Sequence, residues 1–235
     1  MRARCVRRLG RGRRLLRGTV IPLDVALRVA RKRVAAAGAE LILPDDLRRV
    51  IVVGLVAAAH ALQGTTVLSG DVRERVTVTL PGVPGVASTL LGMIPIVGSA
   101  LASLGLANGR TAVYLSPAAM RDGVELLATV EHELGHVGSI ARGGLAYCGA
   151  YLLAPEVRAG GEAPCYGAGM AVRVACGAVL EDVVRDALAS LEGYGLDVSA
   201  RALASGIIAS AAHTIRATGD YGGIIAELRA EGVAL

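Results

Sequence analysis

The sequence predicts an α+β protein that is mainly α-helical and carries a small sheet. Three observations lead to this prediction. The chain is rich in alanine, leucine and arginine, which favour helix, and it contains neither phenylalanine nor tryptophan. Most long segments place apolar residues at helical spacing, and only two short segments alternate apolar and polar residues as strands do. The core must therefore be built from small side chains on helices that approach each other closely.

Residues 1–18 form a basic arm in which arginine recurs throughout. A secretory signal needs a continuous apolar stretch after its charges, and the arginines leave none. We therefore expect a cytoplasmic or virion-associated protein. The arm suits contact with an anionic partner, either nucleic acid or a membrane surface, and the alternative is a solvated tail. It has no aromatic residues to stack on bases, which argues against sequence-specific reading of nucleic acid.

The rest of the chain, residues 19–235, has no internal repeat and no long linker, so we expect a single domain. Its first helix is predicted over residues 22–37 and ends before Gly38. A second helix is predicted over residues 44–62, with acidic residues in its first turn, where the helix dipole favours them. His60 lies in the apolar half of this helix, and we interpret it as a packing residue.

Two strands are predicted from alternation. Residues 72–80 place valine and leucine on one face and Thr77 and Thr79 on the other. Residues 111–115 form the second stretch with this character.

An uncharged apolar insertion, residues 86–107, separates the two strands and contains 22 residues without a charge. Its length would just cross a bilayer. However, Pro95 interrupts it, and neither flank carries a basic cluster or an aromatic belt. We interpret it as a buried or lid-like hairpin over the site. The alternatives are a membrane-associated segment and a docking surface that makes a homo-oligomer or larger assembly.

The motif His132-Glu133-Leu134-Gly135-His136 lies in a helix predicted over residues 117–141 and capped by Ser116, with a break at Gly123 as the alternative. Residues four apart share one face of a helix, so the two histidines can hold one metal ion. Glu133 is one step around the helix, where its carboxylate can take a proton from a metal-bound water. Gly135 costs the helix about 1 kcal/mol relative to alanine, which predicts close packing there.

The motif and its flanks resemble the zincin metallopeptidases, in the short form that carries His-Glu-Leu-Gly-His. The resemblance extends from near Ser116 to about Tyr166. It implies a zincin-like core, with a strand beside the motif helix whose edge binds an extended substrate. It also implies Zn²⁺ as cofactor and a peptide or protein as substrate. The metzincin subclass is excluded, because Ser139 and Arg142 stand where that subclass has glycine and histidine.

The third metal ligand is expected to be a glutamate on a following helix, predicted over residues 162–178. Glu162 resembles the glutamate of the Glu-Ala-x-x-Tyr helix that supplies this ligand in many small His-Glu-x-x-His proteins. Glu156 is the alternative, since its spacing from the motif is like that of the thermolysin-type enzymes, although Gly160 stands where their aspartate is expected. Three further solutions stay open: Asp182, His213, or no third protein ligand.

The remaining helices follow from apolar spacing and from start and stop residues. They are predicted over residues 145–154, after Gly143 and Gly144 end the motif helix, over 179–192, from a cap at Asp197 or Ser199 to His213, and over 221–231.

The four cysteines match no zinc-finger or redox spacing. We interpret Cys148, Cys165 and Cys176, together with Cys5, as free thiols, of which the buried ones pack in the core. A Cys148–Cys165 disulfide, or a cysteine ligand to the metal, is the alternative.

The predicted function is zinc-dependent hydrolysis of peptide bonds. His132, His136 and a glutamate hold the ion, and Glu133 accepts a proton from water and passes it to the leaving amine. The alternative is a structural or assembly protein, for example of a virus, in which a zincin-like core is a catalytically silent scaffold. The basic arm, the uncharged insertion and the small-residue core suit a subunit packed against others.

Overall fold

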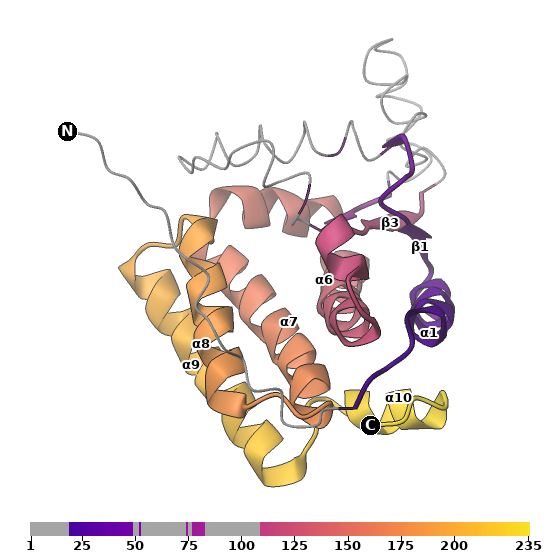
Figure 1. The fold of residues 1–235 in the computed structure, drawn as a ribbon. Coiled ribbons are helices and arrows are strands. Elements are labelled where there is room, and N and C mark those ends of the chain that lie inside the picture. The colour runs from indigo at the N-terminus through magenta and orange to yellow at the C-terminus, as the bar shows by residue number, and fades with distance from the viewer. Residues whose placement is uncertain (1–18, 49–51, 53–73, 75–76, 83–108) are drawn as a thin grey trace, which may run out of the picture.

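The computed structural model describes residues 19–48, 52, 74, 77–82 and 109–235. Within these ranges the protein is mainly helical with a three-stranded sheet, which confirms the α+β class. The motif helix α6 (Gly123–Leu153) is central, as Figure 1 shows. Helix α1 (Leu23–Ala36) and the sheet lie on one side of it, and α7 (Pro155–Ala175) lies on the other.

Three predictions lie wholly or mostly outside the described residues. They concern the basic arm, the apolar insertion and most of the helix expected over residues 44–62. At the start of that helix, Pro44 and Asp45 form a turn, and Arg48 is helical. Among the helices of the described ranges, none combines the length and hydropathy that crossing a bilayer would need.

The sheet has the strand order β1-β3-β2. Strand β3 (Thr111–Tyr114) confirms the strand predicted at 111–115. It pairs in parallel with β1 (Ala39–Ile42) and antiparallel with β2 (Val78–Leu80). Strand β1 was not predicted. It follows α1 after Gly38, whose φ of 75° makes the turn, and its sequence, Ala-Glu-Leu-Ile, does not alternate along its length.

The strand predicted over residues 72–80 is shorter than expected, because Glu74 is helical and β2 begins only at Val78. Strand β3 ends at Tyr114, although the next residue, Leu115, still donates a hydrogen bond to the Ile42 carbonyl of β1 at 2.9 Å. Beside the start of β2, the Thr77 hydroxyl accepts a hydrogen bond from the Ser116 amide at 3.0 Å.

The motif helix begins at Gly123, the residue of the alternative break, and Asp122 there accepts the Glu125 amide at 2.8 Å. The cap predicted at Ser116 is present, but it starts a separate 3₁₀ turn, η2 (Pro117–Met120). At the other end, Gly144 adopts φ 56° and ψ −150° and bends α6, and the chain continues as helix to Leu153. The short helix predicted after the glycine pair is this second part of α6.

Helix α7 begins at Pro155, earlier than the predicted start at residue 162, so Pro164 lies inside the helix and not in its first turn. An internal proline lacks the N–H that would bond to the carbonyl four residues earlier, and its ring crowds that carbonyl. The residue four positions earlier is Gly160, which has no side chain to add to the crowding.

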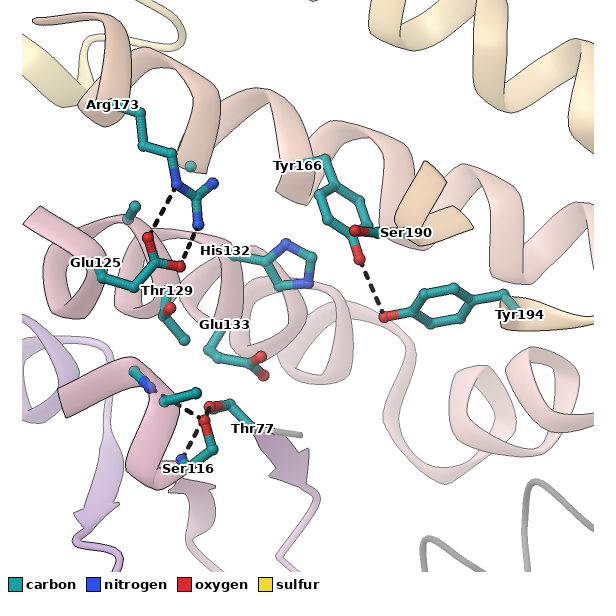
Figure 2. Close-up of a pocket in the computed structure, with 14 residues that line it drawn as sticks. Thr77, Ser116, Glu125, Thr129, His132, Glu133, Tyr166, Arg173, Ser190 and Tyr194 are labelled. Carbon is teal, nitrogen blue, oxygen red and sulfur yellow. Dashed lines mark hydrogen bonds and ion pairs between the residues drawn. The ribbon is translucent and has the colours of Figure 1, made fainter. Parts of the chain in front are cut away.

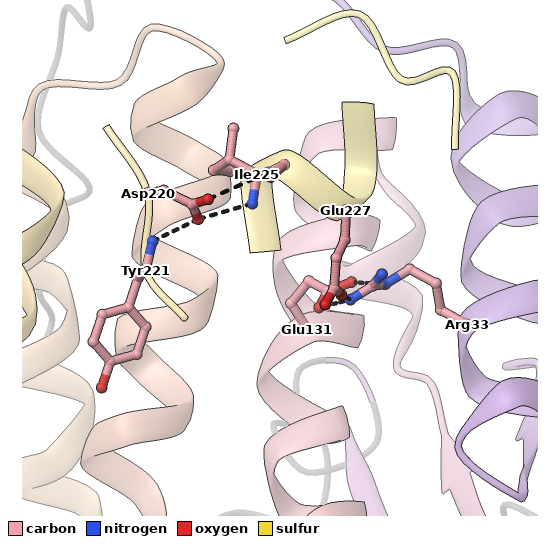
Figure 3. Close-up of polar contacts among 7 residues, drawn as sticks. Arg33, Glu131, Asp220, Tyr221, Ile225 and Glu227 are labelled. Atoms are coloured by element: carbon pink, nitrogen blue, oxygen red, sulfur yellow. Dashed lines mark hydrogen bonds and ion pairs between the residues drawn. The ribbon is translucent and has the colours of Figure 1, made fainter. Parts of the chain in front are cut away.

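The outer helices largely follow the prediction. Helix α8 (Leu180–Leu191) leads through a 3₁₀ turn, η3 (Glu192–Tyr194), into α9 (Val198–Thr218), which begins at the predicted cap Asp197 and extends past His213. Helix α10 (Ile224–Ala230) is the last element. Its start is fixed by Asp220, whose carboxylate accepts the amides of Tyr221 and Ile225 at 2.6 and 2.9 Å (Figure 3).

Close packing between α6 and α7 at Gly135 confirms the expectation for this residue. A β-carbon at Gly135 would lie 2.5 Å from Cys165 Sγ, while the Cys165 Cβ would be 3.5 Å away. The sulfur cannot easily move, since it is buried and bonds to the Gly161 carbonyl at 3.0 Å. The absent side chain at Gly135 therefore sets the distance between the two helices that carry the motif and Glu162.

We expect Gly135→Ala to lower the free energy of unfolding by about 2 kcal/mol through overpacking. In a Cys165→Ala background the obstructing sulfur is gone, so adding Gly135→Ala should cost little. Urea unfolding of the wild type, both single variants and the double variant measures this coupling. Equal costs of Gly135→Ala in both backgrounds would contradict the packing explanation.

Candidate metal centre

The structure brings together His132, His136 and Glu162, one group of residues that could hold a metal ion. Both histidines project from the first part of α6, one turn apart, and Glu162 projects from α7. The Nε2 atoms of His132 and His136 are 3.2 Å apart. His132 Nε2 is 3.3 Å from Glu162 Oε2, and His136 Nε2 is 3.2 Å from Glu162 Oε1.

These separations fit a small tetrahedral ion. Ligand atoms around tetrahedral zinc, with bonds of about 2.0–2.1 Å, lie about 3.3–3.4 Å apart. The two Nε2 atoms are 3.2 Å apart, and each lies 3.2–3.3 Å from a different oxygen of Glu162, so these atoms are spaced like ligands around such an ion. Two imidazoles and one carboxylate are also a donor set that suits zinc.

The carboxylate of Glu162 supplies a second test of the fit. Its side chain is 3% exposed, and within the described part of the chain no hydrogen bond satisfies its buried Oε2. A buried carboxylate oxygen without a hydrogen bond is costly unless a cation compensates it. His132, His136 and Glu162 are therefore the residues that would hold a metal ion.

The sheet, which lies on the other side of α6 from α7, holds Glu133 in place. Its side chain is buried, and the Thr79 hydroxyl of edge strand β2 donates to Glu133 Oε2 at 2.7 Å. The polar face predicted for this strand thus points toward the motif helix. One carboxylate oxygen is fixed by this contact, so the orientation of Glu133 is set by the sheet and not by solvent.

A polar pocket opens beside His132 and Glu133 and has a volume of about 240 Å³. Figure 2 shows its two ends: an ion pair between Glu125 and Arg173 at one, and the hydroxyls of Tyr166 and Tyr194 at the other. Small or hydroxyl-bearing residues form the rest of the lining: Thr77, Ser116, Ala118, Ala119, Ala128, Thr129, Gly169 and Ser190. The pocket therefore connects the motif histidine and glutamate to a space without large apolar side chains.

Aromatic rings continue on both sides of the two histidines. The chain has 6 tyrosines and no other aromatic ring besides histidine, and four of these tyrosines gather here. The ring of Tyr166 stands edge-on to His132 at 4.7 Å between centroids, and Tyr151 stands edge-on to His136 at 6.1 Å. Burial, together with the charge of Glu162, raises the pKa of Tyr166 to about 12, so its hydroxyl keeps its proton at neutral pH.

The alternative third ligands lie elsewhere. Glu156 is exposed and accepts a hydrogen bond from Ser199 at 3.2 Å. Asp182 is exposed and pairs with Arg185, and His213 is exposed on α9. None of the three belongs to the ligand group formed by the described residues.

The cysteines with described positions, Cys148, Cys165 and Cys176, are free thiols, so the Cys148–Cys165 disulfide is wrong. Cys165 packs beside the site on α7 without joining the ligand group. Burial raises the pKa of its thiol above the ordinary value, which disfavours the thiolate that a metal would need.

Several residues of the site were not identified from the sequence. Thr79, Tyr151, Tyr194 and the Glu125–Arg173 pair come from separate elements, and no spacing links them. One indication was available: a chain without phenylalanine or tryptophan places tyrosine four residues apart at 147 and 151 and again at 166, near the predicted ligands.

The ion pair between His136 and Glu162 makes the stability of the metal-free protein depend on pH. Burial lowers the pKa of His136, but the Glu162 carboxylate outweighs it and holds this pKa well above 6.5. Burial raises the pKa of Glu162, but the two histidines outweigh it and hold this pKa well below 4.5. The contribution of protonated His136 to folding stability is therefore complete below pH 6.5 and is lost as pH rises through the folded-state pKa of His136. The contribution of ionised Glu162 to folding stability is complete above pH 4.5 and is lost as pH falls through its folded-state pKa.

We expect the melting temperature of the metal-free protein to be highest between about pH 4.5 and 6.5 and to fall at higher pH. Excess zinc should stabilise the protein most at high pH, because a metal binds the neutral imidazole. Calorimetry in a chelator and in zinc, from pH 5 to 9, measures both trends. His136→Gln is the control, in which the fall above pH 6.5 should be reduced; a wild-type melting temperature that rises over this range would contradict the assignment.

Comparison with protein-family models, with curated proteins and with solved structures finds no match to this chain. The chemistry of the site therefore has to be argued from its own residues.

Proposed function

We propose that the protein is a zinc-dependent hydrolase of peptide bonds, built on a zincin-like core. The observation that carries the proposal is the ligand group of His132, His136 and Glu162, which lies beside Glu133 and an open polar pocket. The ion pairs among these side chains would serve structure alone equally well. The pocket, which reaches His132 and Glu133 directly, is what favours catalysis.

Each residue has a defined task in this proposal. His132, His136 and Glu162 would hold a zinc ion, which would supply a coordinated water with a pKa of about 7 and a Lewis acid for the substrate carbonyl. Glu133 accepts the proton of the attacking water and delivers it to the leaving nitrogen. Thr79 keeps the Glu133 carboxylate turned toward the sheet side of the pocket by holding Oε2, so we assign the proton transfer to Oε1.

The pocket also favours one kind of substrate. Its lining of alanine, glycine, serine and threonine offers hydroxyl groups and little apolar surface. Large hydrophobic side chains would gain little there, whereas small or polar ones could replace their lost hydration by hydrogen bonds. We therefore propose peptides with small or polar residues at the cleavage site. Edge strand β2, which bears Thr79, lies beside this pocket, where an extended substrate could pair with it.

Metal analysis of the purified protein tests the proposal. We expect one zinc per chain in the wild type, loss of this zinc in His132→Ala, and retention in His213→Ala, which removes the exposed histidine of α9. Cleavage of a fluorogenic peptide library should follow the metal content. A protein without metal, or one in which His132→Ala retains it, would contradict the proposal and leave the silent scaffold as the better description.

A further inference from the structure

We infer that Tyr151 positions the third ligand, Glu162. We also infer that the bend of α6 at Gly144 brings Tyr151 within hydrogen-bonding distance of Glu162. The inference rests on the proposed metal site but concerns a residue outside the motif and outside the ligand set.

The two oxygens of Glu162 have different surroundings. The Tyr151 hydroxyl donates a hydrogen bond to Oε1. Oε2 has no hydrogen bond from the described residues and lies 3.3 Å from His132 Nε2. Oε1 also lies 3.2 Å from His136 Nε2, so the Tyr151 hydroxyl holds the carboxylate in place beside both imidazoles and prevents it from rotating.

The bend at Gly144 allows Tyr151 to reach this position. Its φ of 56° with ψ of −150° lies in a region that is essentially restricted to glycine. Had α6 continued straight, its second part would follow the axis of the motif helix. After the bend, residues 145–153 turn toward α7, and Tyr147 and Tyr151 lie one turn apart on the same face. The Tyr147 hydroxyl reaches Gly161, where an added β-carbon would meet it at 2.4 Å.

A buried arginine fixes the end of the bent segment. Arg158 of α7 is 3% exposed and donates to the carbonyls of Tyr151 and Leu152 at 2.8 and 2.9 Å. These are among the last carbonyls of α6, where a helix dipole favours a cation. The same guanidinium donates to the Tyr194 carbonyl at 2.8 Å. Arg158 therefore holds the backbone of Tyr151, at the ligand, and of Tyr194, at the pocket.

An outer-sphere partner of this kind orients the ligand and strengthens its hold on the metal. Removal of such a hydrogen bond typically weakens metal affinity by about 10–100-fold. Tyr151→Phe removes the hydroxyl and keeps the ring that stands edge-on to His136. Tyr147→Phe is the matched control, because it removes a buried hydroxyl from the same helical segment, one turn away, that makes no hydrogen bond to Glu162.

Competition of each purified protein with a chromophoric chelator measures zinc affinity. We expect Tyr151→Phe to bind zinc about 10–100-fold more weakly than the wild type and Tyr147→Phe to bind within about threefold of it. The visible spectrum of the cobalt-substituted proteins is a second readout, since it reports ligand geometry. It should change in Tyr151→Phe and stay unchanged in Tyr147→Phe.

The outcomes separate this inference from the proposed function. If the wild type binds zinc through His132 and Tyr151→Phe matches it in both affinity and spectrum, the role of Tyr151 is overturned while the metal site stands. If both tyrosine variants weaken binding equally, the effect belongs to packing and the inference again fails. Absence of zinc binding in the wild type would overturn the proposed function first, and this inference with it.

Discussion

Replacing Glu133 with glutamine is expected to lower peptide hydrolysis about a thousandfold while the protein keeps its zinc. Glutamine has the size of glutamate and can still accept the Thr79 hydrogen bond, but its amide cannot accept the proton of water. Loss of a positioned general base typically costs about 10²–10⁴ in rate. The metal ligands are untouched, so zinc content and melting temperature should stay near those of the wild type. Steady-state cleavage of the best library peptide, with zinc analysis of the same sample, measures the separation.

Two further variants calibrate this result. Glu125→Gln changes another acid on the same helix and in the same pocket, one that pairs with Arg173 at 2.7 Å and is not assigned to proton transfer. Its effect on the turnover number should be small. Thr79→Val should fall between the two, because Glu133 keeps its carboxylate but loses its orienting contact. Full activity of Glu133→Gln would show that this carboxylate is not the base.

Replacing Arg33 with methionine is expected to lower the free energy of unfolding by about 3–5 kcal/mol. Arg33 of α1 binds Glu131 through two hydrogen bonds of 2.5 and 2.8 Å and also binds Glu227 of α10 at 2.9 Å (Figure 3). The side chain of Glu131 is 2% exposed, whereas that of Glu227 is 60% exposed. Removal of Arg33 thus leaves the Glu131 carboxylate buried and unpaired, immediately before His132 in the motif helix.

The pH dependence of this loss has a definite sign. Burial raises the pKa of Glu131 above 4.5, and Arg33 limits the rise. Without Arg33 the carboxylate is protonated more readily, and a raised folded-state pKa favours the fold at low pH and disfavours it as pH increases. Urea unfolding should therefore show a larger deficit for Arg33→Met at pH 7.5 than at pH 4.5. A deficit that is constant with pH would contradict an unpaired carboxylate as the cause.

Lys32 provides the matched control, since it is the neighbour of Arg33 and pairs with Glu231 at 2.5 Å with 68% of its side chain exposed. An exposed ion pair contributes about 0–1 kcal/mol, so Lys32→Ala should change the free energy of unfolding very little. In the double variant Arg33→Met/Glu131→Leu no buried charge remains without a partner, and much of the stability should return.

The grouping of His132, His136 and Glu162 could be predicted, the histidines from helical spacing and Glu162 from the resemblance of its helix to the Glu-Ala-x-x-Tyr pattern. Histidines four apart must share a helix face, and Glu162 lies on a helix that directly follows the motif helix. The remaining contacts depend on distances that spacing does not encode. Thr79 comes from edge strand β2, which is placed by its pairing with β3, a strand far along the chain. Tyr151 reaches the site only through the bend at Gly144. In the sequence, the glycine at this position predicts the end of a helix and not a bend.

The same distinction between short-range patterns and long-range contacts applies to the fold. Helices with strong apolar spacing, such as α1 and α8, began and ended close to the predicted residues, and α9 began at its predicted cap, Asp197. Strand β1 was missed because its sequence, Ala-Glu-Leu-Ile, does not alternate along its length, and its place beside β3 depends on a pairing with residues far along the chain. The start of α7 was missed because glycines and an internal proline weaken its helical pattern, whereas packing between α6 and α9 keeps it helical.

The crowding of tyrosines around the ligands gives the protein a built-in optical reporter. With no tryptophan in the chain, its near-ultraviolet emission comes from 6 tyrosines, and four of them are linked through ring contacts to His132 or His136. A paramagnetic ion bound by His132, His136 and Glu162 would quench most of this tyrosine fluorescence. Occupancy could then be followed in the unlabelled protein, at equilibrium or after rapid mixing.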